Sequence, residues 1–226
     1  VTPMLDAQND STPLVVLSGQ VGLKNIGTDA FQEAPATQIT KPITKWSYCL
    51  QNIEEIPYIM DKAFYIANSG KKGVVHIDIP KCISSQEIYL NEWNETLKNI
   101  KSFNNYNKKY NKIDENLKKI IIKIANIINT SKKPILYIGQ GIKHGSKELL
   151  AIVNKNDIPC TSTIHGKGIL NEKHYNSLKW CGMHGLAAAN FAIQESDCII
   201  CIGARFDDRI TGNTDLYAPI ASKKKQ

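Results

Sequence analysis

Short apolar runs that end at glycine or proline recur along the chain, and such runs are typical of buried β-strands. In the first hundred residues they occur at Leu14–Gly19 and Gly73–Pro80. Between them, Ile53–Asn68 places apolar side chains at the three- and four-residue spacing of an amphipathic helix. A strand, a helix and a strand in this order predict a parallel sheet with helices packed against it.

The same alternation resumes near residue 114. Asp114 precedes an amphipathic stretch, and we expect it to be an N-cap, because a short carboxylate side chain accepts hydrogen bonds from the first turn. Further on, the pattern predicts a strand, a helix, a strand, a helix and a strand, at residues 134–139, 146–155, 158–163, 187–196 and 197–203. We therefore predict an α/β protein with two doubly wound parallel-sheet units.

A lysine- and asparagine-rich tract without acidic residues, Asn99–Lys112, separates the two halves. Polar tracts of this kind lack the apolar content to pack, so we expect domains at 1–97 and 114–226 with a linker at 98–113. The net charge of +7 and the interleaved Tyr106 and Tyr110 leave nucleic-acid binding as the alternative for this tract. We prefer the linker, and we expect neither a nucleic-acid partner nor a membrane.

The apolar runs and the cysteines indicate which classes of protein are excluded. No run of about 18 apolar residues is present, so no transmembrane helix is expected. Six scattered cysteines without a secretory signal indicate reduced thiols and a cytoplasmic location. Cys198 and Cys201 form a C-x-x-C, but a strand places them on opposite faces, and no second pair completes a zinc site. We predict that both are core cysteines and that the chain has no metal site.

Ligands of parallel sheets bind at the carboxyl ends of the strands, so the loops after the strands are the candidate site. Three of them are rich in glycine, at Gly139–Gly141, Ile164–Gly168 and Cys181–Gly185. Glycine lets backbone N–H groups approach a phosphate closely, although simple turns also use it. Several such loops around one sheet favour a nucleotide-like ligand.

A fourth loop concentrates four charges in five residues, from Arg205 to Arg209. Arg205 can clamp a phosphate in a bidentate manner or lie along an aromatic ring. Asp207 and Asp208 can hold that arginine or accept hydrogen bonds from ribose or ribityl hydroxyls. The alternative is an ion pair that only closes the loop.

Six segments in order, GQVGLKNIGTDAFQE, SGKKGVVHIDIPK, PILYIGQG, TSTIHGKG, GMHG and IGARFDDRITG, closely resemble the large catalytic subunit of acetolactate synthase. That family is a group of thiamine-diphosphate enzymes. The resemblance implies that pyruvate is decarboxylated and that its hydroxyethyl group is transferred to pyruvate or 2-oxobutyrate, in branched-chain amino acid biosynthesis. It also implies thiamine diphosphate, FAD and Mg²⁺ as cofactors, a homodimer or tetramer, a regulatory small subunit, and a cytoplasmic or plastid-stroma location.

The resemblance assigns residues 1–97 to the later part of a pyrimidine-binding domain and residues 114–226 to an FAD-binding central domain. The family's catalytic glutamate then precedes Val1, and its metal-binding domain follows Gln226. We therefore expect the isolated chain to be inactive.

The resemblance also implies three catalytic residues. Phe31 and Gln32 match the pair that lines the family's reaction centre, Phe31 as a wall and Gln32 as a polar contact. Lys81 matches an active-site lysine that suits the carboxylate of a 2-oxoacid. Cys82 departs from the family by replacing the aspartate that follows this lysine. A loop that only packs against the next subunit is the alternative for Phe31 and Gln32.

Three further positions of the first half carry implied roles. Lys45 matches a lysine at the mouth of the substrate channel, with an ordinary surface charge as the alternative. Gly22 stands where many members have proline. Lys71 replaces an FAD-contacting arginine, which keeps the charge but loses the bidentate fork.

The implied flavin contacts of the second half lie in the four loops after the strands. They are Gly139, Gln140, Gly141, Thr163, Ile164, Gly182, Met183, His184, Gly203, Ala204, Arg205, Asp207 and Arg209. Gln140 replaces the middle glycine of a triplet, and His165 replaces a methionine. Because FAD has no redox role in this family's overall reaction, these departures are expected to affect assembly more than chemistry.

Two other functions stay open. One is a related thiamine enzyme of the glyoxylate carboligase or pyruvate oxidase type, against which the GTDAFQE segment argues. The other is a stand-alone nucleotide-binding module like the NAD-dependent deacylases, which need a catalytic histidine beside a zinc ribbon. The chain has no paired C-x-x-C set for such a ribbon.

Overall fold

A computed structural model of the chain describes residues 1–89, 91, 93–94, 97 and 114–223. The chain forms two compact units, residues 1–112 and 113–226. The expected linker at 98–113, with Tyr106 and Tyr110, and the lysines at 224 and 225 lie outside the described residues. Each unit is a sheet with helices on both faces, which confirms the predicted α/β fold class.

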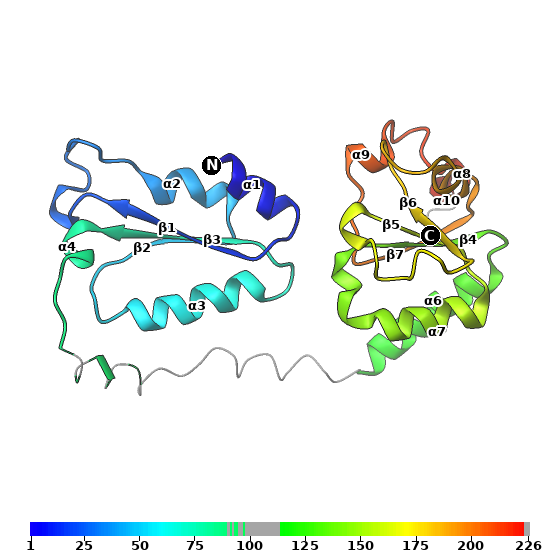
Figure 1. Ribbon diagram of the computed structural model, residues 1–226, viewed down its shortest axis with the longest axis horizontal. Helices are drawn as coiled ribbons and strands as arrows, with labels where there is room; N and C mark the ends of the chain where they lie inside the picture. The colour runs from blue at the N-terminus through cyan, green and yellow to red at the C-terminus, as the bar shows by residue number, and fades with distance from the viewer. Residues whose placement is uncertain (90, 92, 95–96, 98–113, 224–226) are drawn as a thin grey trace. The chain divides into compact units, whose positions relative to one another are not determined.

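The sheet of the first unit consists of three parallel strands in the order β1-β3-β2 (Figure 1). They are β1 (Leu14–Gln20), β2 (Trp46–Cys49) and β3 (Val74–Pro80). The central strand, β3, is almost wholly buried because it is paired on both sides and covered on both faces. The strands expected near residues 14–19 and 73–80 are thereby confirmed, but only β3 is buried as expected, because β1 lies at the edge of the sheet and has no buried residue.

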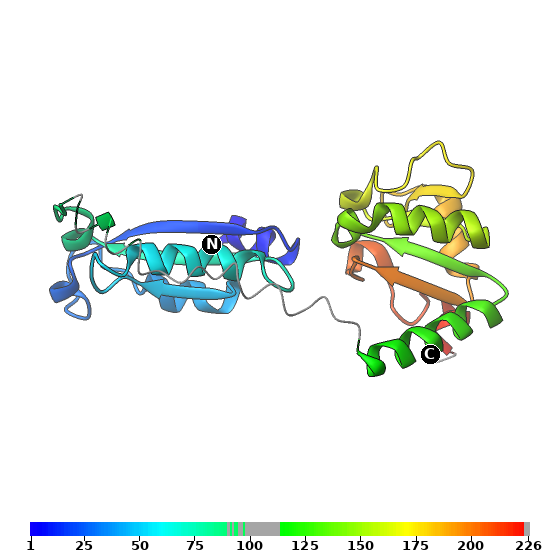
Figure 2. The ribbon, with the colours of Figure 1, turned by 90° about the horizontal axis from the view of Figure 1, so that it is seen from below.

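Helix α3 (Ile56–Asn68) covers one face of this sheet, where Ile59 and Ala63 pack with Val75 and Ile77 of β3 (Figure 2). Two shorter helices cover the opposite face, namely α1 (Thr2–Asn9) and α2 (Ala36–Thr40). Single turns complete the unit at η1 (Leu23–Asn25), η2 (Lys41–Ile43) and α4 (Lys81–Ser84).

The sheet of the second unit has four parallel strands in the order β6-β5-β4-β7. They are β4 (Pro134–Ile138), β5 (Cys160–Ser162), β6 (Ser177–Trp180) and β7 (Cys198–Ile202). Strand β4 carries the core, because alternate side chains enter two apolar clusters. Leu136 and Ile138 belong to one cluster, and Ile135 and Tyr137 belong to the other.

Helices cover both faces of this second sheet (Figure 1). On one face α7 (Ser146–Asn156) packs Leu149 and Val153 against β4, beside α6 (Glu115–Thr130). On the other face α8 (Ala187–Glu195) packs Ala189 and Ile193, beside α10 (Pro219–Lys223). The remaining turns are η4 (Gln140–Gly145), η5 (Ile164–Gly166) and α9 (Asp208–Thr211).

Helix α6 begins as its sequence predicts. The Asp114 carboxylate accepts a hydrogen bond from the backbone N–H of Leu117 at 2.7 Å, so the expected N-cap is confirmed. Ile128 packs against the core, but Ile120 and Ile124 remain about half exposed. The described residues therefore leave much of the apolar face of α6 uncovered.

The prediction for the C-x-x-C is wrong in one respect. Cys198 is half-buried in β7, whereas Cys201 is exposed, so Cys201 is not a core cysteine. The cause is the position of β7, which among the described strands pairs only with β4. The Sγ of Cys201 lies 3.5 Å from the carbonyl oxygen of Ala204. All six cysteines are free thiols.

Two features are absent from the part of the chain that the structure describes. No group of three or more histidine, cysteine, aspartate or glutamate side chains in this part of the chain is arranged to hold a metal ion. Within the same residues, none of the helices combines the length and the apolar character needed to cross a membrane.

Candidate functional site

The three predicted catalytic residues lie in two segments that leave the first sheet at its carboxyl edge. Phe31 and Gln32 lie in the loop after β1, and Lys81 begins α4 directly after β3. Strands β1 and β3 are parallel neighbours, and their register pairs Gln20 with Pro80, so both segments leave the sheet side by side. The Phe31 side chain is 89% exposed, and the Lys81 residue is also exposed. An aromatic ring, an amide and a cation therefore follow strands at the same edge of this sheet.

The loop that carries Phe31 and Gln32 has a fixed local conformation. Gln32 adopts a φ of +64°, which costs a residue with a side chain about 1–3 kcal/mol unless its surroundings impose it. The carboxylate of Glu33 accepts hydrogen bonds from the backbone N–H groups of Gly27 and Ala30. The hydrogen bond from Gly27 is the main reason why the pKa of Glu33 is lowered.

A buried polar network lies on the α2 side of β3. His76 and Asp78 are 2% and 1% exposed. Ser18 Oγ donates to Asp78 Oδ1 at 2.5 Å, which uses its only hydrogen, so His76 Nε2 donates to Ser18 Oγ at 2.7 Å. His76 Nδ1 then faces the hydroxyl groups of Thr40 and Ser47, each at 2.9 Å. A neutral imidazole accepts a hydrogen bond there.

The buried histidine predicts a pH dependence of stability. Burial lowers the pKa of His76 below its usual 6.5, although Asp78 acts in the opposite direction. The unfolded chain therefore takes up a proton more readily, so the free energy of unfolding falls as the pH drops below about 6.5. Melting temperatures between about pH 7.5 and 5.5 should fall steeply for the wild type and less for His76→Gln. The exposed His144→Gln control should keep the wild-type slope, and equal slopes for all three proteins would contradict the prediction.

Two lysines lie at the other end of the first sheet. Lys71 precedes β3 and Lys45 precedes β2, so both are at the amino ends of the strands. The seven residues of β3 span about 23 Å, which separates Lys71 from Lys81. Lys45 Nζ donates to the carbonyl oxygens of Ile66 and Ser69, at the C-terminus of α3, and burial lowers its pKa. Its observed role is to cap that helix.

Two positions that depart from the family lie near the loop that carries Phe31 and Gln32. Gly22 has a φ of −58°, within the range of proline, and a Cβ there would meet no atom within 4 Å. The backbone therefore keeps the conformation that a proline would impose. The thiol of Cys82 accepts a hydrogen bond from the backbone N–H of Leu23 at 3.5 Å. This sulfur joins α4 to the start of the loop that carries Phe31 and Gln32.

Glycines join two loops at the carboxyl edge of the second sheet. Gly141 N–H donates to the carbonyl oxygen of Gly203 at 3.0 Å, which connects the loop after β4 with the loop after β7. A Cβ on Gly139 would lie 2.3 Å from that same oxygen. Gly203 has a φ of +63°, and a Cβ on it would lie 2.5 Å from the nitrogen of Ile142. Close approach of two backbones thus explains these glycines, and Gln140 occupies the exposed position between two of them.

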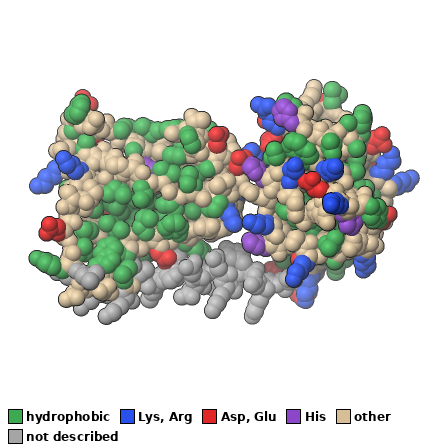
Figure 3. Space-filling view, viewed as in Figure 1, with side chains coloured by type: hydrophobic (Ala, Val, Ile, Leu, Met, Phe, Trp, Pro, Cys, Tyr) green, Lys and Arg blue, Asp and Glu red, His purple; other side chains and the backbone are tan. Residues whose placement is uncertain are grey.

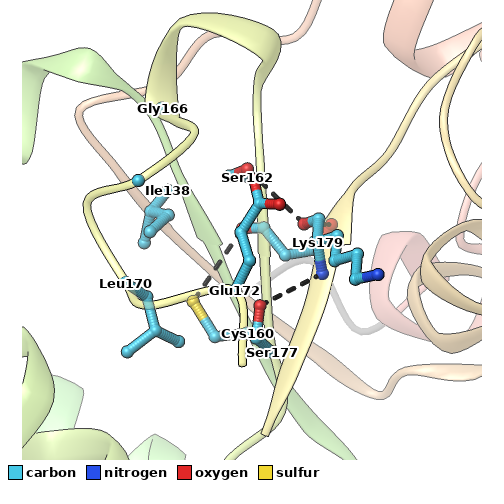
Figure 4. A pocket seen from close by; sticks show the side chains of 10 residues that line it. Ile138, Cys160, Ser162, Gly166, Leu170, Glu172, Ser177 and Lys179 are labelled. Carbon is cyan, nitrogen blue, oxygen red and sulfur yellow. Dashed lines mark hydrogen bonds between the residues drawn. The ribbon is translucent and has the colours of Figure 1, made fainter. Parts of the chain in front are cut away.

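The loop after β5 joins the same edge. Thr163 N–H donates to the carbonyl oxygen of Ile138 at 2.8 Å, and Thr163 Oγ1 accepts from Gly166 N–H at 3.0 Å. Ile164, at the turn, is 58% exposed. A small pocket lies beside this loop and is lined by Ser162, Gly166 and Glu172, among others (Figure 4).

The loop at Gly182–His184 is held by a residue that sequence reasoning missed. Asn190 of α8 donates from Nδ2 to the carbonyl oxygen of Gly182 at 3.0 Å, and its Oδ1 accepts from Gly182 N–H at 2.8 Å. Met183 N–H donates to the carbonyl oxygen of Arg209 at 2.7 Å, which connects this loop with α9. Met183 and His184 are exposed. The sequence feature that could have indicated this contact is Asn190 itself, an amide side chain in the first turns of the predicted helix.

The charged loop is arranged around Asp207. Its Oδ1 accepts hydrogen bonds from the N–H groups of Arg209 and Ile210, which caps α9, and its Oδ2 lies 3.4 Å from Arg205 Nη2. Tyr137 Oη holds the backbone by donating to the carbonyl oxygen of Arg205 at 2.9 Å. Asp208 and Arg209 form a loose, exposed pair at 3.9 Å. Asp207 therefore closes the loop, while the Arg205 side chain remains 47% exposed.

These loops form one surface with the chemistry that a dinucleotide requires. The contacts above join the segments 139–141, 163–164, 182–184 and 203–209 at the carboxyl ends of the strands. Arg205 offers a cation to a diphosphate, and the exposed Ile164 and Met183 offer apolar contact to a flat ring. The residues present therefore fit a flavin dinucleotide.

Comparison with known proteins shows what the second unit resembles. Residues 121–225 match the family described as thiamine pyrophosphate enzyme, central domain. This part of the chain is therefore similar to the central domain of thiamine pyrophosphate enzymes.

The sequence similarity to known proteins extends over the whole chain. It is 41% identical over 226 residues to the mitochondrial acetolactate synthase catalytic subunit of Saccharomyces cerevisiae, covering 99% of this chain and 33% of that one. It is 38% identical to the chloroplastic acetolactate synthase 2 of Nicotiana tabacum, covering 96% and 32%. It is 39% identical to the acetolactate synthase of Mycobacterium leprae, covering 98% and 34%. The chain is a homologue of acetolactate synthase catalytic subunits and spans about a third of their length.

Proposed function

We propose that the protein containing this chain is an acetolactate synthase, which condenses pyruvate with pyruvate or 2-oxobutyrate and releases CO₂. The observation that supports this most strongly is the similarity to enzymes of that name, which runs through both units at 37–41% identity in the first three relatives. The grouping of Phe31, Gln32 and Lys81 at one sheet edge agrees with such a reaction.

The proposed roles of these residues follow from their side chains and exposure. The Lys81 ammonium pairs with the carboxylate of a 2-oxoacid, which orients the substrate. The Gln32 amide donates a hydrogen bond to a polar atom of the reacting molecule, and the ring of Phe31 excludes water from one side. When bound, thiamine diphosphate supplies the carbanion chemistry, and Mg²⁺ completes the cofactor set.

We assign FAD to the carboxyl edge of the second sheet. Arg205 and Arg209 supply positive charge, and Met183 and Ile164 supply apolar surface beside the glycine-rich backbone. The predicted FAD contact of Lys71 rests on the family resemblance alone. The proposed role of FAD is structural, so its binding affects the stability of the assembled enzyme.

The surface of the first unit supports a larger assembly. Apolar side chains cover much of its visible face (Figure 3). Leu17 of β1 and Phe64 of α3 are both more than half exposed, on the side of the sheet that α3 covers. Such a surface suits contact with further protein. We propose a homodimer or tetramer, with a regulatory small subunit as a partner, in the cytoplasm or the plastid stroma.

The test is an assay of the full-length protein with pyruvate, thiamine diphosphate, Mg²⁺ and FAD. We expect acetolactate, detected by the colour reaction of the acetoin that acid decarboxylation yields. The Lys81→Ala variant should lose most of this activity, whereas Lys24→Ala, which removes an exposed lysine of η1, should retain it. Turnover of glyoxylate without acetolactate from pyruvate would instead support a glyoxylate carboligase.

A further inference from the structure

One amide side chain contacts both ends of the loop that carries Phe31 and Gln32. Gln20, the last residue of β1, accepts at Oε1 a hydrogen bond from the N–H of Val21 at 2.9 Å. Its Nε2 donates to the carbonyl oxygen of Ala34 at 2.7 Å. Val21 begins the loop and Ala34 lies near its end, so the Gln20 side chain closes the loop like a clasp.

The third contact of Gln20 fixes the orientation of its amide. Nε2 also donates to Asp78 Oδ2 at 2.9 Å, so both amide hydrogens and the amide oxygen are engaged. A flipped amide would place its NH₂ group against the N–H of Val21 and its oxygen against the Asp78 carboxylate. Both contacts would then be repulsive, so only the observed orientation satisfies every group.

Asp78 ties this clasp to the centre of the sheet. It lies on β3, the middle strand, and its residue is 1% exposed. Its other oxygen, Oδ1, accepts from Ser18 Oγ, which itself accepts from His76. Ser18 is also the register partner of Asp78 on the adjacent strand β1. The position of the Asp78 carboxylate is therefore fixed by β3, which carries it, and by the hydrogen bond from Ser18 of β1. The hydrogen bond from Gln20 is additional to these.

We propose that Gln20 and Asp78 are positioning residues that close the loop from Val21 to Ala34 and hold Phe31 and Gln32 at the carboxyl edge of the sheet. The loop closure follows from the contacts above. The effect on turnover rests on the proposed acetolactate synthase function. Neither residue contacts the reacting atoms in this account, and both act through the position of the loop.

The first measurement tests loop closure without any assay of activity. In the full-length protein, Gln20→Met keeps the length of the side chain but removes all three hydrogen bonds. We expect the backbone amides of residues 27–33 to exchange with deuterium about tenfold faster, while those of β3 stay protected. Ser47→Ala is the matched control, because it removes a hydroxyl from the same network on the side away from the loop. Unchanged exchange in Gln20→Met would overturn the proposal.

The second measurement tests the effect on the reaction. We expect kcat/KM for pyruvate to fall about 10- to 100-fold in Gln20→Met, as displacement of catalytic groups commonly does, and to stay near the wild-type value in Ser47→Ala. An equal loss in both variants would mean a general effect of stability and would overturn the positioning role. A wild type without carboligase activity would refute the proposed function and the role in turnover, whereas the exchange data would still report on loop closure.

A pH profile separates positioning from simple destabilisation. Gln20→Glu keeps the acceptor for Val21 but loses both donors and places a second carboxylate beside Asp78. A proton taken up by the introduced carboxylic acid restores one donor, so the activity of this variant relative to the wild type should rise several-fold as the pH is lowered from about 8 to 6. A profile parallel to that of the wild type would overturn the role of the Gln20–Asp78 contact.

Discussion

Replacement of Gly203 by alanine is expected to lower the free energy of unfolding by about 2–5 kcal/mol. The φ of +63° alone costs a residue with a Cβ about 1–2 kcal/mol. The new Cβ would also lie 2.5 Å from the nitrogen of Ile142 and 2.6 Å from the carbonyl carbon of Gly141, which forces two loops apart at a further cost of about 1–3 kcal/mol. Urea denaturation of the variant and the wild type measures the loss.

Gly168→Ala is the matched control for this prediction. Gly168 also has a positive φ, +82°, but a Cβ there would meet no atom within 4 Å. Its substitution should therefore cost only the conformational part, about 1–2 kcal/mol. Equal losses for Gly168→Ala and Gly203→Ala would show that the two loops are not in close backbone contact.

The Arg205→Ala variant of the full-length enzyme is expected to bind FAD about ten- to a hundredfold more weakly. Loss of a hydrogen bond from a charged group is worth about 1.5–3 kcal/mol, which corresponds to that change in the dissociation constant. The guanidinium is partly exposed and 3.4 Å from Asp207, so that carboxylate orients it without covering it. Fluorescence titration of FAD into the apo-enzyme reports the binding directly.

The control for Arg205→Ala is a variant that removes another positive charge from the loops at the carboxyl edge of the second sheet. Lys143→Ala deletes an exposed positive charge in η4, in the segment that follows β4. It should change the dissociation constant by less than about threefold, because a solvated charge near a ligand contributes little. If Arg205→Ala lowers the melting temperature and leaves the FAD dissociation constant unchanged, then the arginine only closes the loop with Asp207.

The elements that the sequence alone predicted share one property, which is a continuous apolar run or stripe. The runs at Leu14–Gly19 and Gly73–Pro80 became β1 and β3. Only β3 is buried on both faces, as a run of this kind predicts, whereas β1 lies at the sheet edge. Strands β2 and β6 were not predicted. Both are short and lie at a sheet edge, and each includes polar residues, such as Ser47 in β2 and Lys179 in β6.

For the candidate site, the motifs identified the loops, and the fold showed which loops meet. Strand order cannot be read from the motifs, yet it places the loops after β1 and β3 side by side and the loops after β4 and β7 in backbone contact. The same folding separates Lys71 from Lys81 by the length of β3. The ligand roles of these residues stay predictions.

The sequence by itself determined the α/β class, the main strands and helices and the relationship to acetolactate synthases, because periodicity and ordered motifs are local properties of the chain. Three sets of hydrogen bonds were visible only in the tertiary structure. They are the bond from Gln20 to Asp78, the bonds between Asn190 and Gly182, and the bonds by which Lys45 caps α3. The first and last of these join residues at least 21 positions apart. Such contacts depend on strand pairing and burial, which bring a donor to an acceptor without leaving a periodic pattern in the sequence.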